Sequence, residues 1–322
     1  MKALCRISVL TGFALTGGSL MADGFNNSQF SPVMVSPAQT WQYKDNRVEG
    51  QFSQGTSDTT VDSADSKVET SVSDMTFQAA GTYRIPNLPV TTSLELTNQS
   101  AEADFKGVDF GAEWDILLIR PGVSLDINKN IAVGLSVGFA QSDFDYSGPF
   151  SPEDDDDSWT ESKLGVVWHN DRAEAGLAYE PKIGERDDQD GYSAGSRTTV
   201  HGRYAIHPIV AVGGSLTRAA YSEESASLKD VNETSLTVEV SPMPEWSIEG
   251  AWNYKPASYD DKKDIDESNL ERQMVSLSTD YAMTKALSVG GLAGFEKAEG
   301  SDDQDDIGND KLRLGLRGAW TF

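Results

Sequence analysis

The sequence has 322 residues, of which 51 are acidic and 26 basic, and its formal net charge of −25 argues against nucleic acid as a partner. A mean hydropathy of −0.42 and the lack of a long apolar run after the first residues argue against a bundle of transmembrane helices. The single cysteine, Cys5, lies near the start, so the remainder of the chain has no disulfide or thiol chemistry.

The first 22 residues have the pattern of a secretory signal peptide. Lys2 and Arg6 provide a positive start, residues 7–20 are apolar or small, and Ala22 is a small residue before a cleavage point near Asp23. The segment is too short and too rich in glycine to span a bilayer. We expect residues 1–22 to be removed on export; the exact cleavage site stays open, because Leu20 suits the cleavage motif poorly.

Residues 23–41 form a short irregular lead that contains two prolines, Pro32 and Pro37. Residues 42–322 then show the pattern of one antiparallel β domain. Apolar and polar residues alternate in segments of ten or more, as expected where side chains point to opposite faces of a strand in turn. Clear examples are residues 75–85 and 131–140. About fourteen such segments can be counted, and no linker divides them.

The segment at residues 108–127 is the least regular of these. Its apolar run from Ile116 to Ile119 does not alternate with polar residues, and Pro121 has no N–H to donate to a neighbouring strand. The sequence therefore predicts a β-bulge or kink at Pro121.

The last twelve residues form the most informative segment. Leu312, Leu314, Leu316, Trp320 and Phe322 all lie on one face of a predicted strand, and charged residues lie on the other. This segment resembles the closing strand of a bacterial outer-membrane β-barrel. The resemblance implies an all-β, transmembrane, antiparallel up-and-down barrel of about fourteen strands in the outer membrane of a Gram-negative bacterium. It also implies that Trp320 and Phe322 form the C-terminal insertion signal.

The same resemblance implies the surroundings of the protein. Its partners would be outer-membrane lipid, lipopolysaccharide and the outer-membrane insertion machinery. Short turns at residues 86–89, 128–130, 170–171, 207–208, 242–244 and 284–285 alternate with longer, acidic loops. In such barrels the short turns are periplasmic and the long loops extracellular, and we expect that orientation here.

The polar face of the predicted strands would line the barrel interior. The residues expected to set the electric field of this lumen are Arg84, Glu95, Lys163, Arg203, Glu239, Glu249, Asp280, Arg313 and Arg317. Buried charges must be paired or hydrated, so the interior is either wet or laced with ion pairs. Small inward residues between Ala132 and Ala140 are expected to leave local space on one wall.

Candidates for catalysis or metal binding are few. His169 and His201 are predicted to face the lumen and His207 to lie in a turn, and none belongs to a recognisable nucleophile motif. The four consecutive residues Asp154 to Asp157 do not have the alternating ligand pattern of a calcium loop. We therefore predict no enzyme, cofactor or dedicated metal site; whether the acidic loops bind divalent cations stays open.

A second resemblance concerns about thirty residues at the start of the mature chain. Gly24-Phe25, and Ser31-Pro32-Val33-Met34 before a strand at Val48, look like a degraded form of early elements of the FadL-type transporters for hydrophobic compounds. Ser31 and Val33 depart from that family's Asn-Pro-Ala element, and the lead is shorter than its hatch. The resemblance implies passive uptake of small or hydrophobic compounds through a lumen partly closed by an N-terminal plug. The expected plug residues are Pro32, Val33, Met34 and Pro37.

Two functions stay open at this point. The first is the channel or transporter, for which a lateral opening for hydrophobic cargo predicts a break in strand pairing near Pro121. The alternative is a non-transporting structural or surface-interaction protein, in which the acidic loops are the working surface and ion pairs close the lumen. The sequence names neither the substrate nor the oligomeric state.

Overall fold

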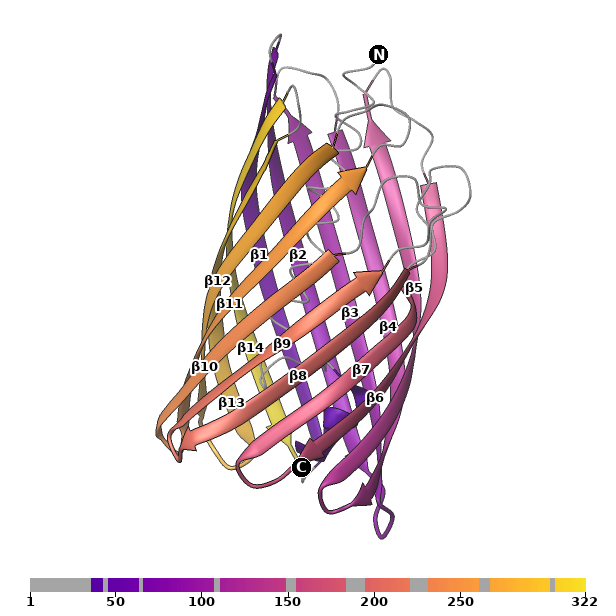
Figure 1. Cartoon of the computed structure of the whole chain (residues 1–322), viewed down its shortest axis with the longest axis vertical. Coiled ribbons are helices and arrows are strands. Elements are labelled where there is room, and N and C mark those ends of the chain that lie inside the picture. Colours follow the sequence, from indigo (N-terminus) through magenta and orange to yellow (C-terminus); the bar gives the residue numbers. More distant parts are fainter. Residues whose placement is uncertain are drawn as a thin grey trace.

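The computed structural model describes residues 36–42, 46–63, 66–106, 111–148, 155–183, 195–220, 231–260, 267–301 and 305–322. In these residues, fourteen antiparallel strands close into a barrel (Figure 1). This confirms the fold class and the strand number expected from the sequence.

The elements follow one another in the simplest possible order. A short 3-10 helix, η1 (Pro37–Gln42), precedes the strands. The strands are β1 (Arg47–Ser63), β2 (Ser66–Arg84), β3 (Val90–Phe105), β4 (Gly111–Asn128), β5 (Ile131–Ser147), β6 (Asp155–His169), β7 (Ala173–Ile183), β8 (Gly195–His207), β9 (Val210–Ala220), β10 (Val231–Met243), β11 (Trp246–Asp260), β12 (Glu267–Ala282), β13 (Leu287–Ser301) and β14 (Asp305–Thr321).

Each strand pairs with the next, and β14 pairs with β1 to close the barrel. The closing ladder runs from Arg47 opposite Thr321 to Ser63 opposite Asp305. The predicted short turns gather at one end of the barrel together with Phe322, which we call the short-turn end; it is the lower end in Figure 1. The opposite, long-loop end carries the other connections. Most strands have 13 or more residues, so they are longer than the ~10 that a tilted strand needs to cross a bilayer.

The two faces of the wall differ as the alternating pattern predicts. Large apolar side chains such as Phe52, Leu236 and Leu316 lie on the outside, and Leu316 is 70% exposed. Polar side chains such as Gln51 and Gln78 point inward and are buried. In the described part of the chain, no second layer covers the apolar outer face. An apolar band around the whole barrel fits contact with hydrocarbon. No described helix is long and apolar enough to cross a membrane.

The segment around Pro121 differs from its prediction. The β3–β4 ladder runs through Pro121 without interruption, with Leu94 opposite. The β4–β5 ladder passes from Ile119 opposite Phe139 directly to Gly122 opposite Ser136. The register is the same on both sides, so the predicted β-bulge is wrong. Between these two pairs, Arg120 and Pro121 have no partner on β5. Proline has no N–H and therefore cannot donate a ladder hydrogen bond.

Candidate functional site

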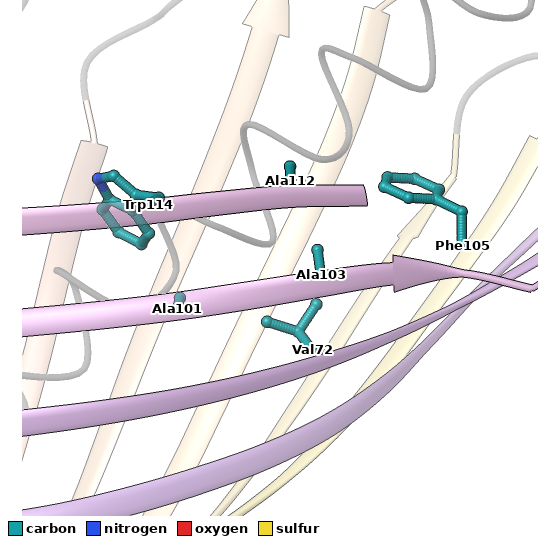
Figure 2. Close-up of a cluster of buried hydrophobic side chains, with 6 residues drawn as sticks. All are labelled: Val72, Ala101, Ala103, Phe105, Ala112 and Trp114. Atoms are coloured by element: carbon teal, nitrogen blue, oxygen red, sulfur yellow. The ribbon is translucent and has the colours of Figure 1, made fainter. Parts of the chain in front are cut away.

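An apolar cluster covers part of the inner wall near the long-loop end of the barrel. The residues of this inner apolar cluster are Val72, Ala101, Ala103, Phe105, Ala112 and Trp114 (Figure 2). Ile116, Phe144 and Tyr146 pack against them. They come from β2, β3, β4 and β5, at positions whose side chains point inward. On this wall of the barrel the inward-pointing side chains are thus apolar and buried.

The aromatic part of this cluster is built by strand register. Ala101, Trp114 and Phe144 occupy directly opposed positions on β3, β4 and β5. The rings of Trp114 and Phe144 stack with centroids 5.9 Å apart and an interplanar angle of 16°. Trp114 is only 2% exposed. This site was missed from the sequence, although the non-alternating run in β4 was its signal: Ile116 and Leu118 face inward while Leu117 and Ile119 face outward.

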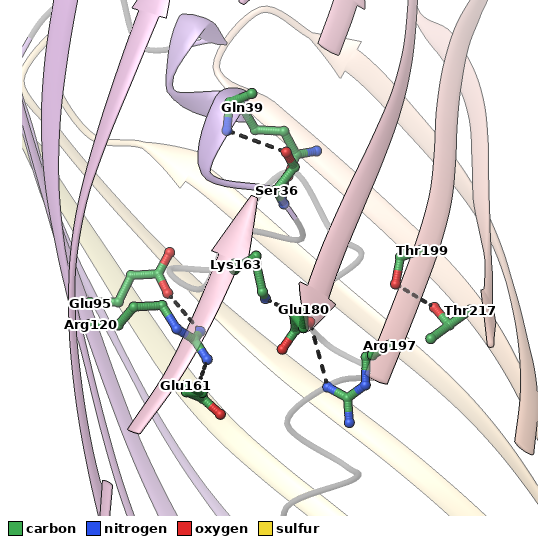
Figure 3. A network of polar contacts seen from close by, with 11 residues as sticks. Ser36, Gln39, Glu95, Arg120, Glu161, Lys163, Glu180, Arg197, Thr199 and Thr217 are labelled. Atoms are coloured by element: carbon green, nitrogen blue, oxygen red, sulfur yellow. Dashed lines mark hydrogen bonds and ion pairs between the residues drawn. The ribbon is translucent and has the colours of Figure 1, made fainter. Parts of the chain in front are cut away.

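A belt of charged side chains follows the cluster toward the short-turn end. Arg120 lies between two carboxylates: its Nη1 is 3.1 Å from Glu95 Oε2, and its Nη2 pairs with Glu161 (Figure 3). Gly138 of β5 lies between Arg120 and Glu161 in the wall, and a Cβ there would be 2.7 Å from Glu161 Cγ. The missing side chain therefore lets the guanidinium reach across β5.

Three side chains from β6, β7 and β8 complete this belt. Lys163 Nζ is 3.4 Å from Glu180 Oε1, and Arg197 Nη1 is 3.9 Å from the same oxygen. We call these six residues, Glu95, Arg120, Glu161, Lys163, Glu180 and Arg197, the charge belt. It contains three cations and three anions, and each cation has a carboxylate partner. Pairing of this kind stabilises charges that are held away from water.

The helix η1 lies inside the barrel on the short-turn side of the charge belt, against β3, β4, β5 and β6; it is drawn above the belt in Figure 3. Ser36, Ala38 and Thr40 are completely buried. A Cβ on Gly134 would lie 2.5 Å from the carbonyl carbon of Pro37, and one on Gly165 would overlap Ser36 Oγ. The local space predicted on the wall between Ala132 and Ala140 is thus filled by η1.

Polar contacts fix η1 on this wall. Gln39 Nε2 donates a hydrogen bond to Glu174 Oε1 at 3.0 Å, and the hydroxyl groups of Thr40 and Ser124 are bonded to each other. Glu174 Oε1 also lies 3.3 Å from Nδ1 of the buried His201. Of the expected plug residues, Pro37 is the first residue of η1, whereas Pro32, Val33 and Met34 lie outside the described residues.

The structure places the nine expected lumen residues on the inner face but not in one site. They are distributed around the barrel as Arg84 with Asp126, Glu95 and Lys163 in the charge belt, Arg203 with Glu239, Arg317 with Asp280, Arg313 with Asp74, and the buried Glu249. Of the two alternatives for the interior, the described residues favour ion pairs. An effect of these residues on selectivity remains a prediction.

The remaining candidates from the sequence are the C-terminal aromatic residues and two histidines. Trp320 and Phe322 lie on the outer face, 59% and 61% exposed, with ring centroids 5.8 Å apart. His169 faces the interior, and His207 is exposed at the end of β8. Within the described residues, no group of three or more histidine, cysteine, aspartate or glutamate side chains is placed to hold a metal ion.

The fold and the interior define a class: closed fourteen-stranded barrels with an apolar outer face, a polar and partly apolar lumen, and a chain segment packed inside. No protein-family model matches the sequence, and no curated protein matches it. Solved structures do share the fold. A Pseudomonas aeruginosa FadL homologue has 11% identity and a TM-score of 0.69, covering 93% of this chain and 96% of that one.

Two aromatic hydrocarbon channels have the same architecture. The P. putida toluene transporter TodX has 11% identity and a TM-score of 0.68, covering 89% of this chain and 93% of that one. The CymD monoaromatic hydrocarbon channel has 12% identity and a TM-score of 0.61, covering 92% and 94% of the two chains. The resemblance to FadL-type barrels is therefore confirmed for the fold.

Proposed function

We propose that this protein is an outer-membrane channel of a Gram-negative bacterium through which small hydrophobic compounds cross passively. The apolar outer face supports the location, because exposed side chains of this size require hydrocarbon around them. The structural neighbours that carry hydrophobic compounds support the activity by fold analogy alone.

The single observation that carries the proposal is the inner apolar cluster. Stacked aromatic rings on the inner wall near the long-loop end give a hydrophobic compound side chains to pack against, whereas charged pairs line other parts of the described interior. Burial of apolar surface there gives a hydrophobic compound a binding site within the barrel, at about 25 cal/mol per Å² removed from water. The cluster, the charge belt and η1 then follow one another along this wall, and Figure 3 shows the belt next to η1.

Two ways out of the lumen are consistent with this arrangement. Movement of η1 would open the short-turn end. Alternatively, cargo would leave through the wall near Pro121, where two pairs are missing from the β4–β5 ladder and the Arg120–Glu161 ion pair crosses the inner surface. The uninterrupted β3–β4 ladder counts against an opening on its own side.

Uptake by proteoliposomes tests the proposed function. Phe144→Ser removes one ring of the stack and with it apolar contact for the cargo. Because the lost contact weakens binding of the cargo, we expect the initial rate of uptake of a small hydrocarbon such as ethylbenzene to fall roughly tenfold. Ser142→Ala, two residues away on the same face of β5, is the matched control and should transport normally. Unchanged uptake in Phe144→Ser would contradict the proposed route.

The structural alternative has its own support, because ion pairs lace the described interior. Planar bilayers distinguish the two functions. A channel should give steps of conductance, and deletion of residues 23–42, including η1, should enlarge them. Silent bilayers with and without this deletion would favour the structural role.

A further inference from the structure

Among the buried side-chain donors of the inner wall that have no partner, three are neutral N–H groups that lie close together. They are Nε1 of Trp114, Nε2 of Gln99 and Nε2 of Gln78, and the three side chains are 2%, 2% and 1% exposed. An unpaired buried donor costs free energy comparable to a lost hydrogen bond, so such groups are rare in folded proteins.

Strand register brings these donors into one line. Gln99 on β3 lies opposite Ile116 on β4, and Trp114 is two residues from Ile116, so Gln99 and Trp114 are diagonal neighbours. Gln99 lies opposite Thr76 on β2, two residues from Gln78. We call Gln78, Gln99 and Trp114 the donor diagonal. It runs from the inner apolar cluster toward the charge belt.

The orientation of Trp114 fits a ligand in this region. Its indole nitrogen lies on the side of the ring that is turned away from Ala112 and Phe105 (Figure 2). Inward-facing Ile116 is next to it on β4, and Phe144 stacks on the ring. The surface therefore combines apolar contact with donors that point at no protein acceptor.

We propose that the donor diagonal and the inner apolar cluster bind compounds that combine an apolar body with an uncharged hydrogen-bond acceptor, such as a ketone, ester or ether oxygen. This inference rests on the proposed transport function and narrows its substrate class. An acceptor oxygen satisfies donors that a pure hydrocarbon leaves unpaired.

Charge argues against an anionic cargo. Lys311 and Arg313 lie on the same level of the wall as the cluster, but both already pair with Asp74. The cations of the charge belt are also paired. A carboxylate would have to compete with a resident carboxylate for any of them. The N–H groups of the donor diagonal itself are neutral, and neutral acceptors suit them.

Isothermal titration of the mature chain in detergent, with empty micelles subtracted, tests this with three probes of similar shape: ethylbenzene, acetophenone and benzoate. We expect acetophenone to bind roughly fivefold to tenfold more tightly than ethylbenzene, the gain of about one hydrogen bond. Benzoate should bind more weakly than acetophenone. Equal binding of the ketone and the hydrocarbon, or tightest binding of benzoate, would overturn the assignment.

Trp114→Phe removes the N–H and keeps an aromatic ring, since an indole nitrogen can only donate. The variant should lose most of its preference for the ketone while it binds ethylbenzene normally. Trp168→Phe, on the outer face, is the control and should keep the preference. An equal loss for both probes in Trp114→Phe would contradict a role of the donor. Failure of all three probes to bind the native chain would instead refute the transport function itself.

Discussion

Two parts of the inner wall at the same level of the barrel have opposite chemistry. Ala101, Trp114 and Phe144 on β3, β4 and β5 form the apolar side. In the same row Asp74 of β2 lies opposite Ala101, and Asp74 pairs with Arg313 of β14 across Gly55 of β1. We call Asp74, Lys311 and Arg313 the seam cluster, because it joins the first two strands to the last.

The seam cluster is held together by several direct polar contacts. Lys311 Nζ lies 2.6 Å from Asp74 Oδ1, and Arg313 Nη1 donates to Ser53 Oγ at 3.2 Å and to Thr76 Oγ1 at 3.1 Å. Arg313 is 1% exposed. Charged contacts thus join β1, β2 and β14 at the seam, whereas the inner apolar cluster and η1 occupy the adjoining wall, where η1 lies against β3 to β6.

The largest expected effect is on the seam. Asp74→Ala leaves Lys311 and Arg313 buried without their common carboxylate, and the loss of one partner from a buried ion pair costs about 3–5 kcal/mol. We expect the urea midpoint of the refolded barrel in detergent to fall accordingly. Asp58→Asn, on the exposed outer face of β1, is the control and should change the midpoint little. A normal midpoint for Asp74→Ala would show that the seam does not hold the barrel closed.

The next effect belongs to the wall that carries η1 and should appear in conductance more than in stability. Gly165→Val places a side chain where Ser36 and Pro37 of the η1 segment now lie. Such overpacking costs about 1–3 kcal/mol if η1 stays in place, so we expect η1 to be displaced and the conductance in planar bilayers to rise. Gly250→Ala, whose added Cβ meets nothing within 4 Å, should behave as the native chain. An unchanged conductance would remove η1 from the channel path.

The difference between the two walls also shows what the sequence can and cannot predict. The strands and their faces follow from a period of two, because every segment obeys the same local rule. Contacts inside the lumen do not follow from this period, since they depend on which inward-pointing residues meet across the barrel. Asp74 and Arg313 are 239 residues apart in the chain. Arg120 reaches Glu161 only because Gly138 between them has no side chain.

The apolar wall was missed for a related reason. The prediction for β4 treated the run from Ile116 to Ile119 as a disturbance of the alternation and placed a bulge at Pro121. In the structure the strand alternates normally, and the run is apolar on both faces because this part of the interior is apolar too. An apolar residue at an inward position, read together with Trp114 and Phe144, would have indicated the cluster.

The smallest expected effect concerns the one hydrogen bond between Gln39 of η1 and Glu174 of β7. Gln39→Leu removes the bond from Gln39 Nε2 to Glu174 Oε1, worth about 0.5–1.5 kcal/mol, while Ser36 and Pro37 stay seated on Gly134 and Gly165. We expect a severalfold rise in the open fraction of single channels and an unchanged urea midpoint. Glu174→Ala, which removes the acceptor, and the double variant complete a double-mutant cycle. If the bond holds η1, the two changes will be less than additive. Full additivity would mean that η1 is retained by its fit against the glycines alone, so that only the shape of this wall keeps the segment inside the barrel.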